Sequence, residues 1–246
     1  MTLPDKHEAV CSYLEWDSNF FGLRIARSNR SCLDHTTLAA TLDWCDAQRI
    51  DCLYFLADPD HAETTRIAEK NGFQFTDVRV TLEQSLVENK SLAEEADGIR
   101  LAREEDLPAL RRIASVTHRD TRFYFDEHFD RAKCDFLYET WIENSFRGFA
   151  QAVLVAEVDQ SPAAYLTCHL KGTEAQIGLL GVSASHQGKR LGTQLTKHFL
   201  AWSREQEAKR ALVVTQGRNL AAQRLYQRQG FVTASTRLWY HRWFAR

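Results

Sequence analysis

The stretch Ile177–Leu195, IGLLGVSASHQGKRLGTQL, decides the fold of this chain. An apolar run typical of a buried strand stops at Val182, the chain turns through small and polar residues, and a helix begins within the glycine-bracketed segment QGKRLG at 187–192. Free backbone N–H groups at the start of a helix form an anion site, which the helix dipole reinforces. The stretch therefore predicts a place for a pyrophosphate-sized group between a strand and a long helix.

The residue types within QGKRLG suit such a site. Gly188 and Gly192 allow the backbone and the helix to approach a bulky phosphate without a Cβ clash, and Lys189 and Arg190 add positive charge. The segment is neither a Walker A loop nor a Rossmann G-x-G-x-x-G turn, because neither spacing is present. A tight turn flanked by solvated basic side chains is the alternative interpretation.

An internal repeat is the second signal. RIAEKNGFQFTDVRV begins at Arg66 and RLYQRQGFVTASTRL begins at Arg224, and both share a Gly-Phe pair and a later arginine at a constant offset of 158 residues. The second copy has Tyr226 where the first has Ala68. We therefore interpret the N-terminal half as a degenerate duplicate of the C-terminal half.

Hydrophobic periodicity predicts an α/β (α+β) fold, in which a mixed sheet carries helices on its faces. The N-terminal half is expected to have helices at 38–50 and 60–72 and strands at 51–58 and 73–83. The C-terminal half is expected to have strands at 98–102, 151–158, 163–170, 174–182, 211–215, 231–235 and 236–244, and helices at 104–118, 133–146, 188–208 and 219–230. Asp106 is expected to cap the first of these helices. The polar segment 86–98 predicts a linker, so we expect two domains, 1–90 and 97–246.

Two motifs in this order and at this spacing resemble those of the GNAT (GCN5-related) N-acetyltransferase superfamily. They are Val182 with Gln187-Gly188-Lys189-x-x-Gly192, and Asn219-x-x-Ala222-x-x-x-Tyr226-x-x-x-Gly230-Phe231. The resemblance covers roughly residues 99–246. It implies a GNAT fold preceded by a truncated GNAT-like half, with acetyl-CoA as the co-substrate. Arg190 replaces the family's usual middle glycine, which leaves less room and an extra charge at that amide. Ala184 replaces the family's common proline before the loop.

The resemblance also implies roles for single residues. The backbone of Leu180 and Val182 would pair with the pantetheine arm, and the Leu180 N–H would donate to the thioester carbonyl. The Tyr226 phenol, whose ordinary pKa is near 10, would protonate the departing thiolate; a buried core tyrosine is the alternative. Ala68 has no such proton, so the first copy is expected to bind no cofactor and to shape the acceptor pocket. The full expected cofactor-binding set is Leu180, Val182, Gln187, Gly188, Lys189, Arg190, Leu191, Gly192, Asn219 and Tyr226.

The general base is the least determined part of the expected site. Asp77 lies where the resemblance places a water-linked carboxylate, although a plain surface role suits it equally well. Glu174 and Gln176 lie on the strand where other GNAT enzymes place their base, and Gln176 has no basic group to offer. Asn219 is expected to cap a helix while lying near the pantetheine.

The stretch HRDTRFYFDEHF at 118–129 is the expected acceptor region. Arg122 would pair with a nucleotide phosphate, and Phe123 or Tyr124 would lie against a base or a sugar ring. A packed surface loop is the alternative interpretation of the same residues.

Further stretches resemble GNAT enzymes that acetylate the 4-amino group of a dTDP-linked 4-amino-4,6-dideoxyhexose in bacterial surface polysaccharide synthesis. They are YLEWDSNFFG, TRFYF, WIENSFRG and STRLWYHR. The implied partner is thus a nucleotide-linked amino sugar. Two alternatives stay open: a GNAT enzyme for another amine, such as an amino acid, a polyamine or a protein N-terminus, and a non-catalytic CoA-binding module.

The composition of the 246-residue chain narrows the remaining possibilities. Its 31 basic and 33 acidic residues give a net charge of -2, without the large basic surplus that a sequence-independent nucleic-acid binder needs. A local basic site for a phosphorylated ligand stays open. Six scattered cysteines without a C-x-x-C pair fit reduced thiols, and nine histidines show no ligand spacing, so we expect no metal. The first residues do not resemble a signal peptide and no apolar run is long enough for a membrane span. We therefore expect a cytoplasmic protein that is not inserted in a membrane, with a homodimer as a possible assembly.

Overall fold

The computed structural model describes residues 9–87 and 98–245. It divides into two compact units. The first comprises Met1–Arg79, Phe125–Phe129 and Thr236–Arg246, and the second comprises Val80–Tyr124 and Asp130–Ser235. Most of the linker expected at 86–98 and most of the segment judged against a signal peptide lie outside the described residues. The described helices include none that is both long and apolar enough to cross a membrane.

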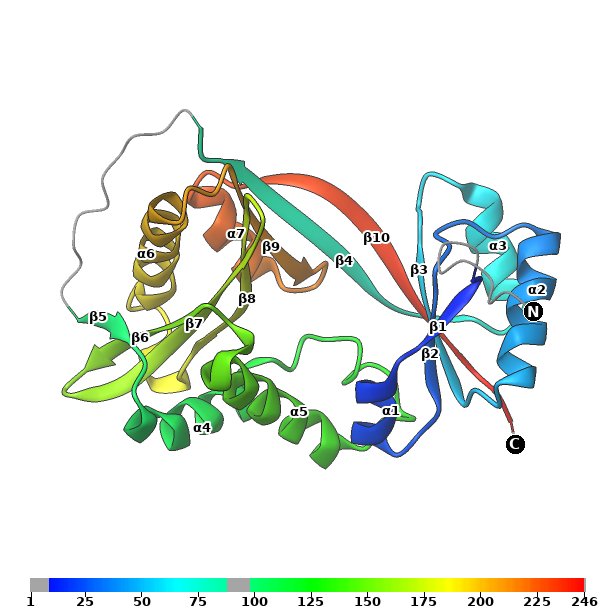
Figure 1. Cartoon of the computed structure of the whole chain (residues 1–246), viewed down its shortest axis with the longest axis horizontal. Helices are drawn as coiled ribbons and strands as arrows, with labels where there is room; N and C mark the ends of the chain where they lie inside the picture. The colour runs from blue at the N-terminus through cyan, green and yellow to red at the C-terminus, as the bar shows by residue number, and fades with distance from the viewer. Residues whose placement is uncertain (1–8, 88–97, 246) are drawn as a thin grey trace. The chain divides into compact units, whose positions relative to one another are not determined.

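The first unit is a small mixed sheet with helices (Figure 1). Its strands follow the order β1-β2-β3-β10-β4, in which β2 runs parallel to β3 and β10 runs antiparallel to β3. The elements are β1 (Cys11–Tyr13), α1 (Glu15–Phe21), β2 (Ile25–Ser28), α2 (His35–Ala47), β3 (Cys52–Ala57), α3 (Ala62–Lys70), and parts of β4 (Gln74–Ser85) and β10 (Val232–Trp243). β4 and β10 each continue into the second unit.

The two faces of the first sheet carry different side chains, because successive residues of a strand point to opposite faces. Phe55 of β3 and its cross-strand partner Tyr240 belong to one apolar cluster with residues of α2 and α3. On the other face, Tyr54 and its partner His241 pack against Phe129, with ring centroids 6.4 and 5.7 Å away. This second face is thus aromatic and partly polar.

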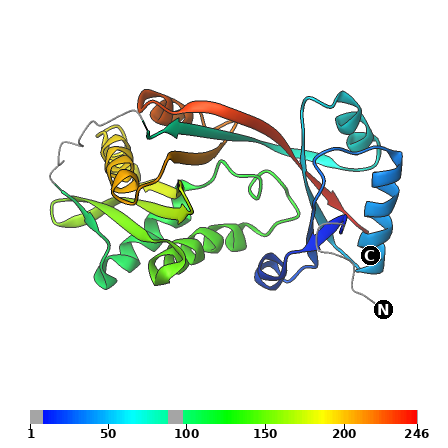
Figure 2. The same cartoon turned by 45° about the horizontal axis from the view of Figure 1, so that its top comes forward.

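The second unit is a larger sheet whose strands follow the order β10-β4-β9-β8-β7-β6-β5. Helix α6 covers one face, and α4 and α5 lie on the opposite face (Figure 2). The elements are β5 (Ile99–Leu101), η1 (Glu104–Asp106), α4 (Leu107–Thr117), α5 (Arg131–Asn144), the π-helical turn η2 (Ser145–Phe149), β6 (Ala152–Val158), β7 (Ser161–Lys171), β8 (Glu174–Val182), η3 (Ala184–His186), α6 (Leu191–Glu205), β9 (Arg210–Gln216) and α7 (Leu220–Arg228). The mixed α/β class expected from the sequence is confirmed.

Three details of the expected elements were wrong. The final strands expected at 231–235 and 236–244 are one strand, β10, because no glycine or proline interrupts the extended backbone. Helix α6 begins at Leu191 and not at residue 188, since Arg190 is in the left-handed region with a φ of 64°. Asp106, expected as a helix cap, makes no capping hydrogen bond to α4.

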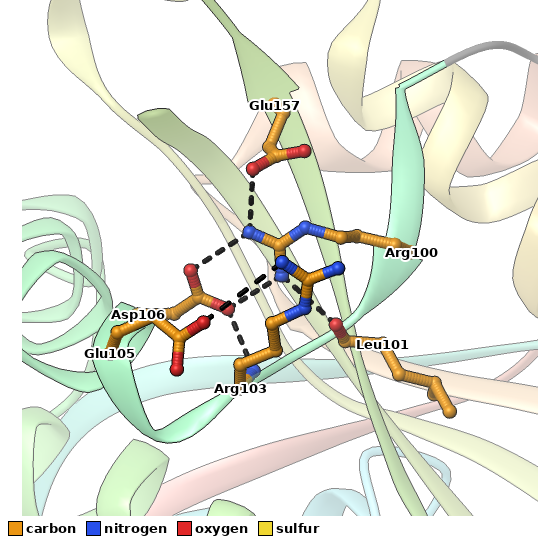
Figure 3. Close-up of polar contacts among 6 residues, drawn as sticks. All are labelled: Arg100, Leu101, Arg103, Glu105, Asp106 and Glu157. Atoms are coloured by element: carbon orange, nitrogen blue, oxygen red, sulfur yellow. Dashed lines mark hydrogen bonds and ion pairs between the residues drawn. The ribbon is translucent and has the colours of Figure 1, made fainter. Parts of the chain in front are cut away.

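Asp106 instead belongs to an ion-pair network at the start of the second unit (Figure 3). The Arg100 guanidinium donates to both oxygens of Asp106, at 2.6 and 2.9 Å, and to Glu157 on β6 at 2.6 Å. The amide of Arg103 donates to Asp106 as well, at 2.7 Å. The guanidinium of Arg100 therefore holds the pKa of the buried Asp106 carboxyl below its usual range.

The internal repeat is also structural. Helix α3 and helix α7 begin and end 158 residues apart, and so do the 12-residue strands β4 and β10. Between helix and strand, each copy has a glycine with positive φ, 77° at Gly72 and 91° at Gly230. A helix end followed by a left-handed residue is the conformation that favours glycine. The Gly-Phe pair is therefore kept in both copies for a reason of backbone geometry.

Candidate functional site

The site begins at a strand edge without a neighbour. β8 pairs in parallel with β9 from Glu174 opposite Arg210 to Ile177 opposite Val213. β8 then continues to Val182, so residues 178–182 have no β9 partner among the described residues. Such an edge offers unpaired N–H and C=O groups to any extended ligand.

The hydrogen bonds to β7 show which amides lie at that edge. The amide of Leu179 donates to Thr167 Oγ1 at 2.8 Å, and the amide of Ser183 donates to the carbonyl of Ala163 at 2.9 Å. Amides along a strand alternate in direction. Those of Leu180 and Val182 therefore point away from β7, toward the open edge, as the expected pantetheine contacts require.

A bulge in β8 sets this geometry. Between Leu166 opposite Leu180 and Cys168 opposite Ile177, β8 has one more residue than β7. A Cβ on Gly178 would lie 2.4 Å from His169 Nε2 and 2.8 Å from Thr167 Oγ1, so this position has no room for a side chain. Bulges redirect the residues that follow them and are frequent beside active sites.

The loop between β8 and α6 presents further unpaired amides. Gln187, Gly188, Lys189 and Arg190 are exposed, and Gly188 has a φ of 79°. Among the described residues, none accepts a hydrogen bond from the amides of Gln187, Gly188 and 190–192. Arg190, the residue before α6, makes no side-chain capping bond. The helix start is therefore open to an anion.

Gly192 has a packing role in addition to the one expected. A Cβ there would lie 3.2 Å from Leu225 of α7, 3.7 Å from Leu180 and 3.9 Å from Val182. The start of α6 thus sits closely on the open end of β8 and on α7. Leu191 beside it is buried. This contact holds the loop next to the unpaired strand edge.

Tyr226 lies on the buried side of α7. It is 4% exposed, its ring packs against Phe231 at 5.8 Å between centroids, and burial raises the pKa of its hydroxyl above the ordinary value. No residue in the described part of the chain forms a hydrogen bond with that hydroxyl. The phenol is therefore protonated at neutral pH and has its proton available. The expected cap is confirmed, since Asn219 accepts a hydrogen bond from the amide of Ala222 at 3.0 Å.

The residues expected to take part in the chemistry are divided between the two units. Leu180 and Tyr226 belong to the second unit, whereas Asp77 belongs to the first, on β4. Asp77 is 2% exposed and its Oδ1 accepts from the amide of Val78 at 2.8 Å. Glu174 forms an ion pair with Arg210. Asp77 as the base stays a prediction.

The expected acceptor residues are occupied by internal contacts. Phe123 is 2% exposed and packs edge-on against Trp141, with the Arg122 guanidinium 4.3 Å from its ring centroid. The Tyr124 hydroxyl donates to Asp135 at 2.5 Å, and Arg131 donates to the Tyr124 carbonyl. This arrangement agrees with a packed loop, and a ligand role for these residues stays a prediction.

Sequence reasoning missed a polar group on the α4 side of β8. The Tyr165 hydroxyl and His118 Nε2 are 2.8 Å apart, and the Tyr165 ring covers Gly181, where a Cβ would lie 2.6 Å from a ring carbon. Burial lowers the pKa of His118 to about 4, so this imidazole is neutral at physiological pH. His118 and Tyr165 are 47 residues apart in the chain, so no local spacing signals this pair.

A second missed group lies in the first unit. The carboxylate of Asp126 accepts from Trp243 Nε1 at 2.9 Å, and its oxygens lie 2.6 Å from His241 Nδ1 and 2.8 Å from His128 Nδ1. Burial alone would raise the pKa of Asp126, but these hydrogen bonds lower it well below the usual range. The group fixes the 125–129 segment to β10.

Comparison with known proteins agrees with this geometry. The model of the acetyltransferase (GNAT) family matches residues 109–231, half of the chain. The chain is 32% identical over 148 residues to the dTDP-fucosamine acetyltransferase of Escherichia coli, a match covering 59% of this chain and 63% of that protein. It is 26% identical over 138 residues to the spore coat polysaccharide biosynthesis protein SpsD of Bacillus subtilis, which covers 56% of this chain and 48% of that protein.

A solved structure shares the fold across nearly the whole chain. It is a GCN5-related N-acetyltransferase from Sphaerobacter thermophilus, with a TM-score of 0.67 and 11% identity, covering 95% of this chain and 76% of that one. The open edge of β8, the uncapped start of α6 and the Tyr226 hydroxyl all lie in or beside the region that the family model matches. The GNAT fold is confirmed, and the chain belongs to the GNAT acetyltransferase family.

Proposed function

We propose that this protein transfers the acetyl group of acetyl-CoA to the 4-amino group of a dTDP-linked 4-amino-4,6-dideoxyhexose. The observation that carries the acetyl-CoA part is the coincidence of three features in one unit: the unpaired Leu180 and Val182 amides, the open 187–192 loop, and the free hydroxyl of Tyr226. The sugar part rests on the two relatives, which are named for fucosamine acetylation and for polysaccharide synthesis.

The residues of the second unit fit acetyl-CoA. The amides at the open edge of β8 would pair with the pantetheine arm as a neighbouring strand does. The amides across 187–192, with Lys189 and Arg190, would hold the pyrophosphate. The co-substrate supplies the acetyl group when bound. The remaining chemistry belongs to the protein.

Three groups would perform that chemistry. The Leu180 amide would donate to the carbonyl oxygen as negative charge builds on it, a contact worth about 3–4 kcal/mol in other acyl-transfer sites. Tyr226 would release its proton to the sulfur as the thiolate departs. Asp77, through water, is our candidate for removing the proton of the sugar ammonium.

For the acceptor, Arg122 is the proposed partner of a nucleotide phosphate, because a guanidinium can bind two phosphate oxygens at once. Phe123 and Tyr124 are proposed to shape the neighbouring surface. We propose that the N-terminal copy, 1–90, provides structural support and shapes the acceptor pocket, while 97–246 supplies the acetyl-CoA site.

A thiol-release assay with a panel of amines tests the proposal. The panel holds a dTDP-4-amino-4,6-dideoxyhexose, the unlinked amino sugar, an amino acid, a polyamine and a peptide with a free N-terminus. We expect kcat/KM for the nucleotide sugar to exceed the others by about 100-fold or more, since a site built for polar groups rejects analogues that lack them. A preference for another amine would overturn the sugar assignment only, whereas failure of acetyl-CoA to bind in calorimetry would overturn both parts.

A further inference from the structure

Three side chains of different chemistry meet in the first unit. Cys32 lies in the loop after β2, and Asp58 and His61 lie in the loop after β3. The Cys32 sulfur, an Asp58 carboxylate oxygen and an imidazole nitrogen of His61 all lie within 4.8 Å of one another. β2 and β3 are parallel, so both loops leave the same edge of the sheet. Ligand sites favour that edge in open α/β sheets.

A pocket of about 600 Å³ opens at this place. Its lining includes the proposed ligands Cys32 and His61 together with charged side chains of both signs. Asp34, Asp60 and Glu63 are acidic, whereas Arg30 is the one basic residue among the residues that line it. The excess of carboxylates attracts a cation and repels a phosphate.

The helix start at this pocket is closed to anions. Asp34 accepts a hydrogen bond from the amide of Thr37 at 2.7 Å, and Thr37 Oγ1 accepts one from the amide of Asp34 at 2.8 Å. This reciprocal capping box occupies amides that an anion would need at the start of α2. The pocket therefore suits a positive ligand better than a nucleotide.

Of the three proposed ligands, Asp58 is oriented by hydrogen bonds, whereas the side chains of His61 and Cys32 can adjust to an ion. Asp58 is oriented by Arg237, which donates to its Oδ2 at 2.7 Å, and by the Asp60 amide, which donates to its Oδ1 at 3.2 Å. Metal-ligating carboxylates are commonly hydrogen-bonded in this manner. His61 is exposed and its side chain makes no capping bond to α3, so the ring can turn. Cys32 is a half-buried free thiol.

From this juxtaposition we propose that the first unit binds one divalent ion of the zinc class through Cys32, Asp58 and His61. Sulfur, nitrogen and a single carboxylate suit Zn²⁺, whereas Mg²⁺ and Ca²⁺ take oxygen ligands. The thiolate and the carboxylate together balance the two positive charges of the ion. Three protein ligands leave the fourth tetrahedral position to water, so the ion ties the two loops together and stays accessible.

Spacing along the chain does not reveal this site, because Cys32 is separated from the other two ligands by β3 and helix α2. The absence of a metal was expected on spacing alone. Only the parallel pairing of β2 with β3 brings the ligands to one edge.

Titration of the metal-free, reduced full-length protein with Co²⁺ tests the proposal, because thiolate-bound Co²⁺ absorbs in the near ultraviolet. We expect one equivalent of Co²⁺ to give the thiolate charge-transfer band with tetrahedral visible bands, and Zn²⁺ to displace it. Cys32→Ser should abolish the charge-transfer band. His61→Ala should weaken binding by roughly 100-fold or more, beyond the usual loss for an outer residue.

Matched controls keep the outcome readable. His35→Ala removes a neighbouring exposed histidine and Asp60→Asn removes a neighbouring carboxylate, and both should retain the band. Circular dichroism on every variant establishes that it is folded. A Co²⁺ spectrum without thiolate character, or one unchanged in Cys32→Ser, would overturn the proposal, as would equal loss in His35→Ala and His61→Ala.

Discussion

The two units differ at the start of the helix that follows β2 in the first unit and β8 in the second. In the second unit α6 begins after Arg190 without a side-chain cap, and unpaired amides face the solvent. In the first unit α2 begins at a capping box made by Asp34 and Thr37. Both helices end 158 residues apart, at Ala47 and Glu205. The helix start is thus satisfied within the chain in the first unit and open in the second.

The next helix repeats the lesson at one position. The bounds of α3 and α7 differ by the same offset of 158 residues. Each helix has a buried residue at the same position, Ala68 in the first copy and Tyr226 in the second. The alanine packs in an apolar cluster, whereas the tyrosine presents a hydroxyl with no partner in the described chain. Both positions are therefore buried, but only Tyr226 carries a hydroxyl.

The largest effect is expected for a change at Tyr226, the position at which the two helices differ in chemistry. Tyr226→Phe keeps the ring against Phe231 and removes only the proton, so kcat should fall by ~10²-fold or more. Acetyl-CoA affinity and the unfolding midpoint should stay near those of the parent protein. Steady-state thiol release, calorimetry and thermal unfolding measure the three quantities. Unchanged turnover would show that the phenol is a packing residue, as its counterpart Ala68 is.

The next effect concerns stability in the two units. Asp106→Ala leaves the Arg100 guanidinium partly buried without its main partner, at a cost of about 2 kcal/mol, below the 3–5 kcal/mol of a fully buried pair. Because the pKa of Asp106 is lowered in the folded state, its contribution is present above the unfolded pKa and is lost as the pH falls below it. Unfolding between pH 7 and pH 3 should therefore be less pH-dependent in Asp106→Asn than in the parent.

Hydrogen exchange decides whether that loss stays local. All residues of the network lie in the second unit. Protection in Asp106→Ala should fall in β5, β6 and β7 and stay unchanged in β1, β2 and β3. An equal fall in both sets of strands would mean that the two units unfold together, and the comparison between them would lose its energetic basis.

The smallest effect is expected on the free energy of unfolding, for a change at Arg190 before helix α6. Arg190 has a φ of 64°, a conformation that costs an ordinary residue about 1–2 kcal/mol and glycine almost nothing. Arg190→Gly should therefore raise the free energy of unfolding by about 1 kcal/mol in urea titrations. Lys189→Gly is the matched control, since Lys189 has no positive φ and should gain nothing. Equal changes in both variants would contradict the backbone explanation.

Features that depend on residues close together in the chain could be predicted from the sequence. Contacts between distant elements could not. The Asn219 cap and the strand 174–182 follow from residues close together in the chain, and both were predicted correctly. The left-handed Arg190 was not predicted, because a turn that tolerates glycine is normally filled by glycine. Its position was noticed only as a departure from the family motif.

The same division holds for the candidate site, of which only the parts within one stretch of sequence could be predicted. The motif located the loop and Tyr226, and strand alternation in the structure accounts for the Leu180 and Val182 amides. The His118–Tyr165 pair, the Asp126 group and the Cys32–Asp58–His61 cluster were missed, because each joins residues from separate elements. Contacts of that kind depend on sheet order, which no single stretch of sequence encodes.

The pairing of β10 with β3 has a consequence for synthesis. The apolar strand Cys52–Ala57 has β2 as one neighbour and receives its other neighbour from Leu238–Trp243, far later in the chain. A nascent N-terminal half therefore leaves the ribosome with an unsatisfied sheet edge, the kind of surface that chaperones shield and that aggregates recruit. Chains that stop at Ser235 should accumulate as insoluble material.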